Sequence, residues 1–323
     1  MRAALEGIAA GTRAGQGIYI RRPETKSWMG LALKSCEFLF HVRKRYGVDW
    51  SRTLTLGRQQ MFVSPKEVGA VADRFGVSFQ ASGAWKAGTG YCESFLHGFG
   101  AKEVDSMDAS DYEGATIRHD LNQPVPQELH GRYDCILDGG TIEHVFHFPN
   151  AIRSCMDMLA VGGHYVAITP ADNQMGHGFY QFSPELYFRI FSAANGFEVR
   201  TALLQTATDW LEVTDPQVVG HRGALVSSTP VILCLVARKV RQVEGFHTPQ
   251  QSDYLDAWSV VDSIKSDTVR EGEGRVRHLV RKYVPLPIKT LLRRVKRLFE
   301  PKLDVEGLRG VDGNSYKRID LYR

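Results

Sequence analysis

The stretch that decides the fold is RYDCILDGGTIEHVFHFPNAI, residues 132–152. Its apolar segment 133–137 is typical of a strand that is buried on both faces of a sheet. Asp138 ends this strand, and a helix is predicted from about 150 to 159, closed by the glycine pair 162–163. A buried strand followed by a helix is the repeating unit of parallel α/β sheets, so this stretch predicts that class of fold.

The same alternation continues on both sides of this stretch. Strands are predicted at 53–56, 103–107, 115–119, 164–169, 197–205 and 231–237, with a long loop before the last of them. Helices are predicted at 28–46, 64–75, 91–99 and 183–195. The helix at 64–75 opens with Ser64-Pro65-Lys66-Glu67, a capping-box pattern with proline at the first helical position. The sequence therefore predicts a Rossmann-like, doubly wound sheet with helices on both faces.

The chain divides into three predicted parts. Its 323 residues exceed one typical domain, and 43% hydrophobic with 24% charged residues is ordinary for a folded protein. We predict a helical N-terminal extension at 1–50, the α/β domain at 51–240 and a basic helical C-terminal tail at 241–323. From residue 241 onward there are 17 Lys and Arg against 12 Asp and Glu, whereas the first 240 residues hold 23 against 24. The excess positive charge therefore belongs to the tail.

Carboxylates fall at the ends of three predicted strands. Asp108, Asp120 and Asp138 each directly follow the last residue of a predicted strand. Ligands of open α/β sheets bind beyond the carboxyl ends of the strands. An acid after the second strand can accept hydrogen bonds from a ribose diol, and one after the third can lie near an adenine amine. Each aspartate alone could equally be a turn residue or a helix cap, but the three together predict an adenosine-containing ligand.

Four segments carry a resemblance to a known family. They are VDSMDASDYEGATIRHDLN (104–122), RYDCILDGGTIEHVFHFPNAI (132–152), LAVGGHYVAITPADNQMGHGFYQFSPELYFRIF (159–191) and NGFEV (195–199). With them the sequence resembles the class I S-adenosylmethionine (SAM)-dependent methyltransferases, in particular bacterial members with a D-G-G-T-[IL]-E-H segment. The resemblance implies a mostly parallel seven-stranded sheet with an antiparallel last strand, and SAM as the cofactor.

The resemblance also implies which residues bind the cofactor. Asp108 takes the place of the family's ribose-binding acid, and Asp120 that of the acid beside adenine, with Leu121 as an apolar contact to the ring. Asp138 and Gly139 face the methionine part of SAM. These positions follow from the family's order along the chain.

The loop after the first strand departs from the family pattern. In place of G-x-G-x-G the sequence has Leu56-Gly57-Arg58-Gln59-Gln60, with one glycine. Gly57 keeps part of the close backbone approach that glycine allows. We hypothesise that Arg58 binds the methionine carboxylate, because a guanidinium suits bidentate recognition of a carboxylate. NAD is a weaker candidate, because the phosphate-binding G-x-G-x-x-G fingerprint is absent.

Two segments offer catalytic candidates. Glu143 and His144 follow the strand at 133–137, and a Glu-His pair there could deprotonate an acceptor; the alternative is that both only cap or pack the next helix. His177 lies in a loop between two glycines and is the leading general-base candidate, although it could merely hydrogen-bond the backbone. Methyl transfer depends largely on alignment, so a dedicated base is not required. His144 and His147 resemble a metal-binding pair, but no third ligand is evident and no metal is predicted.

Two functions follow from these residues. The first is transfer of a methyl group from SAM to an O or N atom of a small-molecule or saccharide acceptor. The second is a non-catalytic binding or scaffold protein on a methyltransferase fold, which the reduced glycine loop and the basic tail both suit. Fold alone does not decide between them.

The C-terminal tail and the cysteines indicate where in the cell the protein is expected. Residues 275–299 form a basic amphipathic stretch that suits contact with an anionic membrane surface, or else a solvated face of its own domain. Nucleic acid is a weaker partner, because aromatic residues are sparse there. Five scattered cysteines without a CxxC pair favour a reducing compartment, and the N-terminus has no apolar signal core. A cytoplasmic protein, with peripheral contact at the inner membrane face, is therefore expected.

Overall fold

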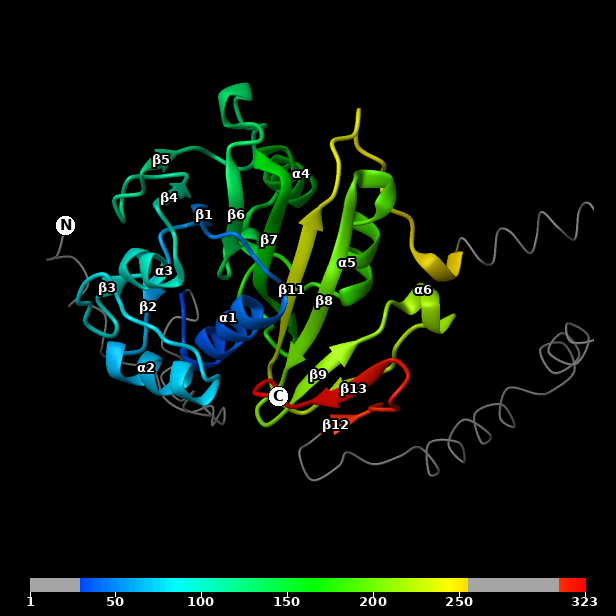
Figure 1. The fold of residues 1–323 in the computed structure, drawn as a ribbon. Helices are drawn as coiled ribbons and strands as arrows, with labels where there is room; N and C mark the ends of the chain where they lie inside the picture. Colours follow the sequence, from blue (N-terminus) through cyan, green and yellow to red (C-terminus); the bar gives the residue numbers. More distant parts are fainter. Residues whose placement is uncertain (1–29, 255–307) are drawn as a thin grey trace, which may run out of the picture.

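The computed structural model describes residues 30–254 and 308–323, in which one large sheet is covered by helices on both faces (Figure 1). The strands are β1 (Arg52–Leu56), β2 (Gln60–Met61), β3 (Gly90–Tyr91), β4 (Glu103–Asp108), β5 (Ile117–Arg118), β6 (Tyr133–Asp138), β7 (Leu159–Asp172), β8 (Phe197–Gln205), β9 (Trp210–Val213), β10 (Val226–Ser227), β11 (Val231–Lys239), β12 (Leu308–Arg309) and β13 (Tyr316–Ile319). The helices are α1 (Leu33–Arg45), α2 (Pro65–Arg74), α3 (Glu93–Phe99), α4 (Phe148–Met158), α5 (Pro184–Ile190) and α6 (Pro216–Val219).

The large sheet is doubly wound, with the strand order β13-β9-β8-β11-β7-β6-β1-β4-β5. β1 lies between β4 and β6 and is parallel to both. β5 continues in parallel from β4, and β7 from β6, while β11 runs antiparallel between β7 and β8. The predicted Rossmann-like class is therefore confirmed, and β11, the last of the seven predicted strands along the chain, is antiparallel to its neighbours.

Two strands extend the sheet beyond the predicted seven. β9 lies in the segment that the sequence pattern indicates as a loop, and β13 pairs with it from the far end of the chain. The prediction of a helical tail is therefore wrong for 316–319, because pairing between strands about one hundred residues apart leaves no local signal. The basic stretch 275–299 lies outside the described residues. In the described ranges, every helix is too short or too polar to cross a membrane.

Alternating residues of the central strands divide the core into two layers. In β6, Ile136 packs into the layer beneath α4 and α5, whereas its neighbours Cys135 and Leu137 pack into the layer beneath α1, α2 and α3. This alternation follows from the two-residue period of a strand. Because both faces are covered, the strand could be almost wholly apolar, as the sequence indicates. Figure 1 shows α1 and α5 on either side of the central strands.

The predicted capping box at the start of α2 is confirmed. The hydroxyl of Ser64 accepts a hydrogen bond from the backbone N–H of Glu67, and the Glu67 carboxylate accepts one from the backbone N–H of Ser64. Pro65 occupies the first turn, where a missing N–H costs nothing. This helix start was readable because all of its determinants lie within four residues.

Candidate functional site

The carboxyl ends of β4, β1 and β6 lie side by side at one edge of the sheet. Leu56, the last residue of β1, pairs with Met107 of β4 on one side and with Asp138 of β6 on the other. The direction of winding reverses between β1 and β6, and ligands of doubly wound sheets bind outside the carboxyl ends at such a point. This edge is therefore the candidate functional site.

The cofactor residues proposed from sequence all belong to this edge. Asp108 is the last residue of β4, and Asp138 is the last residue of β6. Gly57 and Arg58 follow β1, Gly139 follows β6, and Asp120 and Leu121 follow β5. The three aspartates thus stand on the same side of the sheet, on three different strands or the loops that follow them.

Asp108 and Asp120 both close short turns and reach the surface. Oδ1 of Asp108 accepts a hydrogen bond from the backbone N–H of Ser110 at 2.9 Å. Oδ1 of Asp120 accepts two from Asn122, one from its backbone and one from its side chain. These hydrogen bonds lower the pKa of Asp120. Both residues therefore stabilise turns, which was one of the two roles considered from the sequence. Their carboxylates also remain accessible to a ligand.

Asp138 has a different environment, because its side chain is fully buried. Its carboxylate accepts hydrogen bonds from the backbone of Gly140 and Thr141 and from the hydroxyl of Tyr165 at 2.9 Å. Burial and then the nearby charge of Glu143 raise the pKa of Asp138 to about 7. The carboxylate holds the turn after β6 in place, so this residue acts on the site through the backbone it positions.

The loop after β1 is filled by a residue that the sequence reasoning missed. The buried amide of Gln59 donates hydrogen bonds to the carbonyl of Leu56 and to the hydroxyl of Thr141. A side chain at Gly139 would collide with the Gln59 oxygen Oε1, which is itself buried without a hydrogen-bond partner. Gln59 therefore bridges the loops after β1 and β6. A bulky amide in a shortened glycine loop was the available signal.

Arg58 is held by several partners. Its Nε lies 2.6 Å from Glu93, its Nη1 donates to the carbonyl of Glu113 at 2.9 Å, and its guanidinium stacks on Tyr91. Two of its three nitrogens are thus engaged by α3 and by the loop after β4. The guanidinium stands at the site edge in a fixed orientation.

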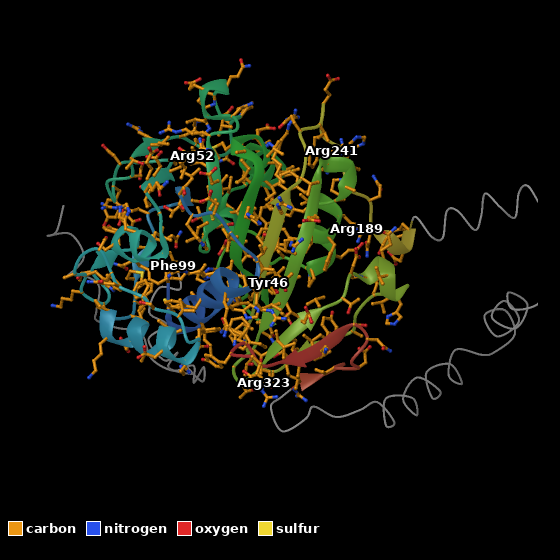
Figure 2. The ribbon with its side chains drawn as sticks, viewed as in Figure 1. Tyr46, Arg52, Phe99, Arg189, Arg241 and Arg323 are labelled. Carbon is orange, nitrogen blue, oxygen red and sulfur yellow. The ribbon has the colours of Figure 1, made fainter. Side chains whose placement is uncertain are left out.

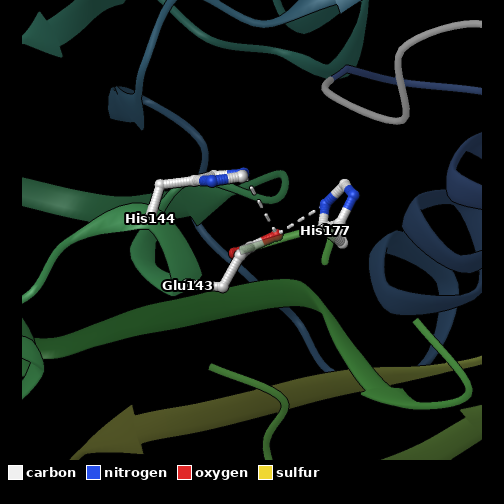
Figure 3. Close-up of side chains that lie close together, drawn as sticks. All are labelled: Glu143, His144 and His177. Carbon is white, nitrogen blue, oxygen red and sulfur yellow. Dashed lines mark ion pairs between the residues drawn. The ribbon is translucent and has the colours of Figure 1, made fainter. Parts of the chain in front are cut away.

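A second group of side chains gathers beside this edge, at Glu143, His144 and His177 (Figure 3). Nε2 of His177 lies 3.3 Å from Oε1 of Glu143, and Nε2 of His144 lies 4.0 Å from the same oxygen. The Glu143 side chain is fully buried, and the histidines are partly exposed. The pKa of His144 is lowered, mainly because the side chain is partly buried. All three predicted catalytic residues therefore meet at one point.

The loop that carries His177 is fastened to Glu143 itself. The carbonyl of Glu143 accepts hydrogen bonds from the backbone N–H groups of Phe179 and Tyr180. A side chain at Gly178 would collide with the backbone of Glu143, so the glycine permits this close approach. These hydrogen bonds join Glu143 to residues 36 and 37 positions further along the chain, so they could not be read from the sequence.

His147 does not belong to this group. It is exposed, its ring packs against Phe146 and its backbone N–H donates to the side chain of Asn122. In the folded chain, His144 lies instead with Glu143 and His177, and the ligand atoms of these three residues all lie within 4.8 Å of one another.

Exposed apolar side chains border the group. Phe146 and Phe179 are 63% and 68% exposed, and their rings meet edge to face at 5.9 Å. Met175, in the same loop as His177, is 90% exposed. Large apolar side chains that gather at the surface mark binding surfaces more often than scattered ones do. A separate cavity of about 180 Å³ lies away from this edge, between the start of α5 and the strands β9 and β13.

Comparisons with known proteins find only distant similarity. No family model matches the chain, and no curated protein is matched by sequence. Among solved structures, one match is 1,6-didemethyltoxoflavin-N1-methyltransferase of Burkholderia thailandensis, bound to its substrate and S-adenosylhomocysteine (12% identity, 65% of this chain and 78% of that chain, TM-score 0.35).

Two further solved structures are also matched at low similarity. One is the branched-chain polyamine synthase of Thermus thermophilus (12% identity, 67% of this chain and 60% of that chain, TM-score 0.34). The other is TehB of Haemophilus influenzae (12% identity, 63% and 61%, TM-score 0.32). At these scores the likenesses carry no argument about ligands. The strand order by itself defines this chain as a Rossmann-like, doubly wound α/β protein.

Proposed function

We propose that the protein is a SAM-dependent methyltransferase that acts on an O or N atom of a small-molecule or saccharide acceptor. The observation that carries this proposal is the convergence of Asp108, Asp120 and the turn after Asp138 at the reversal point of a doubly wound sheet. The family resemblance of the sequence assigns an adenosyl ligand to those positions.

The residues of this edge fit the polar groups of SAM. Asp108 supplies a carboxylate for the ribose diol. By the family resemblance, Asp120 and Leu121 stand on the adenine side, and Gly57 and Gly139 stand beside the methionine part. The buried oxygen Oε1 of Gln59 lacks a partner, and an ammonium group is a donor that would satisfy it. When bound, SAM supplies an electrophilic methyl group.

The acceptor side of the proposal is the group at Glu143, His144 and His177. His177 is placed to take a proton from an acceptor hydroxyl or amine, with Glu143 at 3.3 Å to orient the imidazole and stabilise its charged form. The exposed rings of Phe146 and Phe179 offer apolar surface to a flat or partly apolar acceptor. Alignment of the acceptor with the methyl group remains the larger contribution to the rate.

A second candidate function, a non-catalytic protein on the same fold, is favoured by the loop after β1. Gln59 fills the space between the loops after β1 and β6, and Arg58 is already paired with Glu93. A cofactor would therefore meet more side-chain volume here than a glycine-rich loop leaves.

Calorimetry with S-adenosylhomocysteine tests the cofactor site on which the methyltransferase proposal depends, and turnover of an acceptor then distinguishes it from a non-catalytic protein. We expect the full chain to bind one equivalent, and Asp108→Ala to weaken binding by about tenfold to a hundredfold, because a hydrogen bond to a charged group contributes roughly 1.5–3 kcal/mol. The matched control is Glu103→Ala, an exposed carboxylate at the opposite end of the same strand, which should leave binding unchanged. Absence of binding, or equal loss in both variants, would refute the SAM site.

A further inference from the structure

We propose that Glu143, His144 and His177 bind a divalent transition-metal ion of the zinc class, at a site with an open coordination position. The inference goes beyond the proposed function, because metal binding at this site does not depend on a methyl donor. It rests on burial, on distances and on the chemistry of the three ligand atoms.

Glu143 carries a buried carboxylate whose charge is not satisfied by hydrogen bonds. Its side chain has no exposed surface, and neither of its oxygens has a hydrogen-bond partner. A buried carboxylate without hydrogen bonds is costly, and buried charges are normally paired or bound to metals. Nε2 of His144 is also buried without a partner, on the side that faces the same oxygen. A cation at this point would satisfy all of these atoms at once.

The distances fit a common ion. Around a four-coordinate ion with bonds of about 2.0–2.2 Å, ligand atoms lie roughly 3.3–3.5 Å apart. The separation of His177 Nε2 from Glu143 Oε1 is 3.3 Å, and that of His144 Nε2 is 4.0 Å. All three ligand atoms lie within 4.8 Å of one another, and rotation of the partly exposed His144 ring would bring its Nε2 closer to the other two. Figure 3 shows both histidines turned toward the Glu143 carboxylate from different segments of the chain.

The ligand set selects the kind of ion. Two imidazoles and one carboxylate suit zinc and neighbouring first-row metals, whereas magnesium and calcium prefer oxygen ligands. Three protein ligands leave a further position for water or an acceptor atom, as in catalytic sites. The exposed residues Phe146 and Phe179 each follow one of the two histidines by two positions along the chain.

The surrounding backbone is built to hold the ligands in place. Two backbone hydrogen bonds fasten the His177 loop to the carbonyl of Glu143, and the hydroxyl of Tyr180 donates to the carbonyl of Phe146 at 2.6 Å. Such outer contacts orient metal ligands and contribute to affinity. With an ion bound, Nε2 of His177 is a ligand, and an acceptor hydroxyl on the ion loses its proton more readily. Loss of the acceptor proton would then be promoted by the ion and not by His177 as a base.

Titration of the metal-free full chain, without a polyhistidine tag, tests the site. We expect one equivalent of Zn²⁺ or Co²⁺ to bind, with the visible absorption of low-coordinate Co²⁺, and Mg²⁺ to bind far more weakly. His144→Asn and His177→Asn should each weaken Zn²⁺ binding by at least about tenfold, since even outer contacts of metal ligands contribute on that order. The matched control is His147→Asn, an exposed histidine three residues from His144.

The outcomes separate this proposal from the methyltransferase proposal. Equal Zn²⁺ affinity in all three histidine variants, or binding well below one equivalent by the unmodified chain, would overturn the metal site. Thermal unfolding of each variant checks that it is folded, and Zn²⁺ should raise the melting temperature of the His147→Asn protein more than that of His177→Asn. S-adenosylhomocysteine binding by the metal-free chain is measured separately, so either proposal can fail without the other.

Discussion

Buried ionisable side chains in this protein differ in how they are satisfied. Asp138 accepts hydrogen bonds from two backbone N–H groups and from Tyr165. Glu143 has none, and its neighbours are histidines, which is why we infer a cation there. His164 in β7 also has no partner for either ring nitrogen, but no acidic side chain lies within ion-pairing distance among the described residues, so this imidazole is buried in its neutral form.

The pH dependence of stability should report His164. Burial and the charges of Arg238 and Arg200 lower the pKa of His164 to about 4, below the unfolded value of about 6.5. The unfolded chain therefore binds the proton first, so this contribution to stability is complete above about pH 6.5 and is lost as pH falls toward 4. Between pH 7 and 4.5, we expect the unmodified chain to lose about 2 kcal/mol more of its free energy of unfolding than the His164→Leu variant loses. Urea unfolding at both pH values measures this, and parallel losses in the two proteins would contradict it.

At the scale of elements, long-range side-chain contacts fix where helices end. The end of α4 is an example, because the chain passes directly from this helix into β7. The ammonium of Lys239, on β11, donates to the carbonyls of Met156 and Leu159 at 2.8 Å each. A cation at a helix C-terminus also interacts favourably with the helix dipole. Burial lowers the pKa of Lys239. Its two hydrogen bonds both go to carbonyl groups at the end of α4.

Replacing this lysine should loosen the end of α4. We expect Lys239→Met to reduce the free energy of unfolding by about 2 kcal/mol, because it leaves two buried carbonyl groups without a donor. Lys317→Met, an exposed lysine on β13, should change it by less than about 0.5 kcal/mol. Urea unfolding of both variants provides the comparison, and similar losses would argue against a specific role of the Lys239 contacts.

At the scale of the whole molecule, the C-terminal residues pack against α1, the first described helix. β13 adds the outermost strand of the sheet, and the residues after it reach α1. The carbonyl of Leu321 is 3.0 Å from Nδ1 of His41, and the hydroxyl of Tyr322 donates to Glu37 at 2.8 Å. Figure 2 places the terminal Arg323 beside the lower end of the sheet. The final residues are therefore part of the core layer beneath α1.

A substitution near the C-terminus should consequently be severe. Leu321 is buried among α1 and its neighbours, so we expect Leu321→Ala to cost about 2–4 kcal/mol of unfolding free energy. Chain ends usually tolerate change unless they are packed in this way. Arg323→Ala, two residues on and 90% exposed, should cost less than about 0.5 kcal/mol. A midpoint of thermal unfolding that is unchanged in Leu321→Ala would show that this packing does not stabilise the protein.

Local patterns determined the elements of the central sheet. The apolar run at 133–137, the capping box at Ser64 and the aspartates after β4, β5 and β6 all depend on neighbouring residues, so the sequence predicted them correctly. Contacts between distant segments decided the rest. The meeting of Glu143 with His177, the filling of the β1 loop by Gln59 and the pairing of β13 with β9 each need chain segments brought together by folding. Such contacts are set by packing, which leaves no periodic trace along the chain.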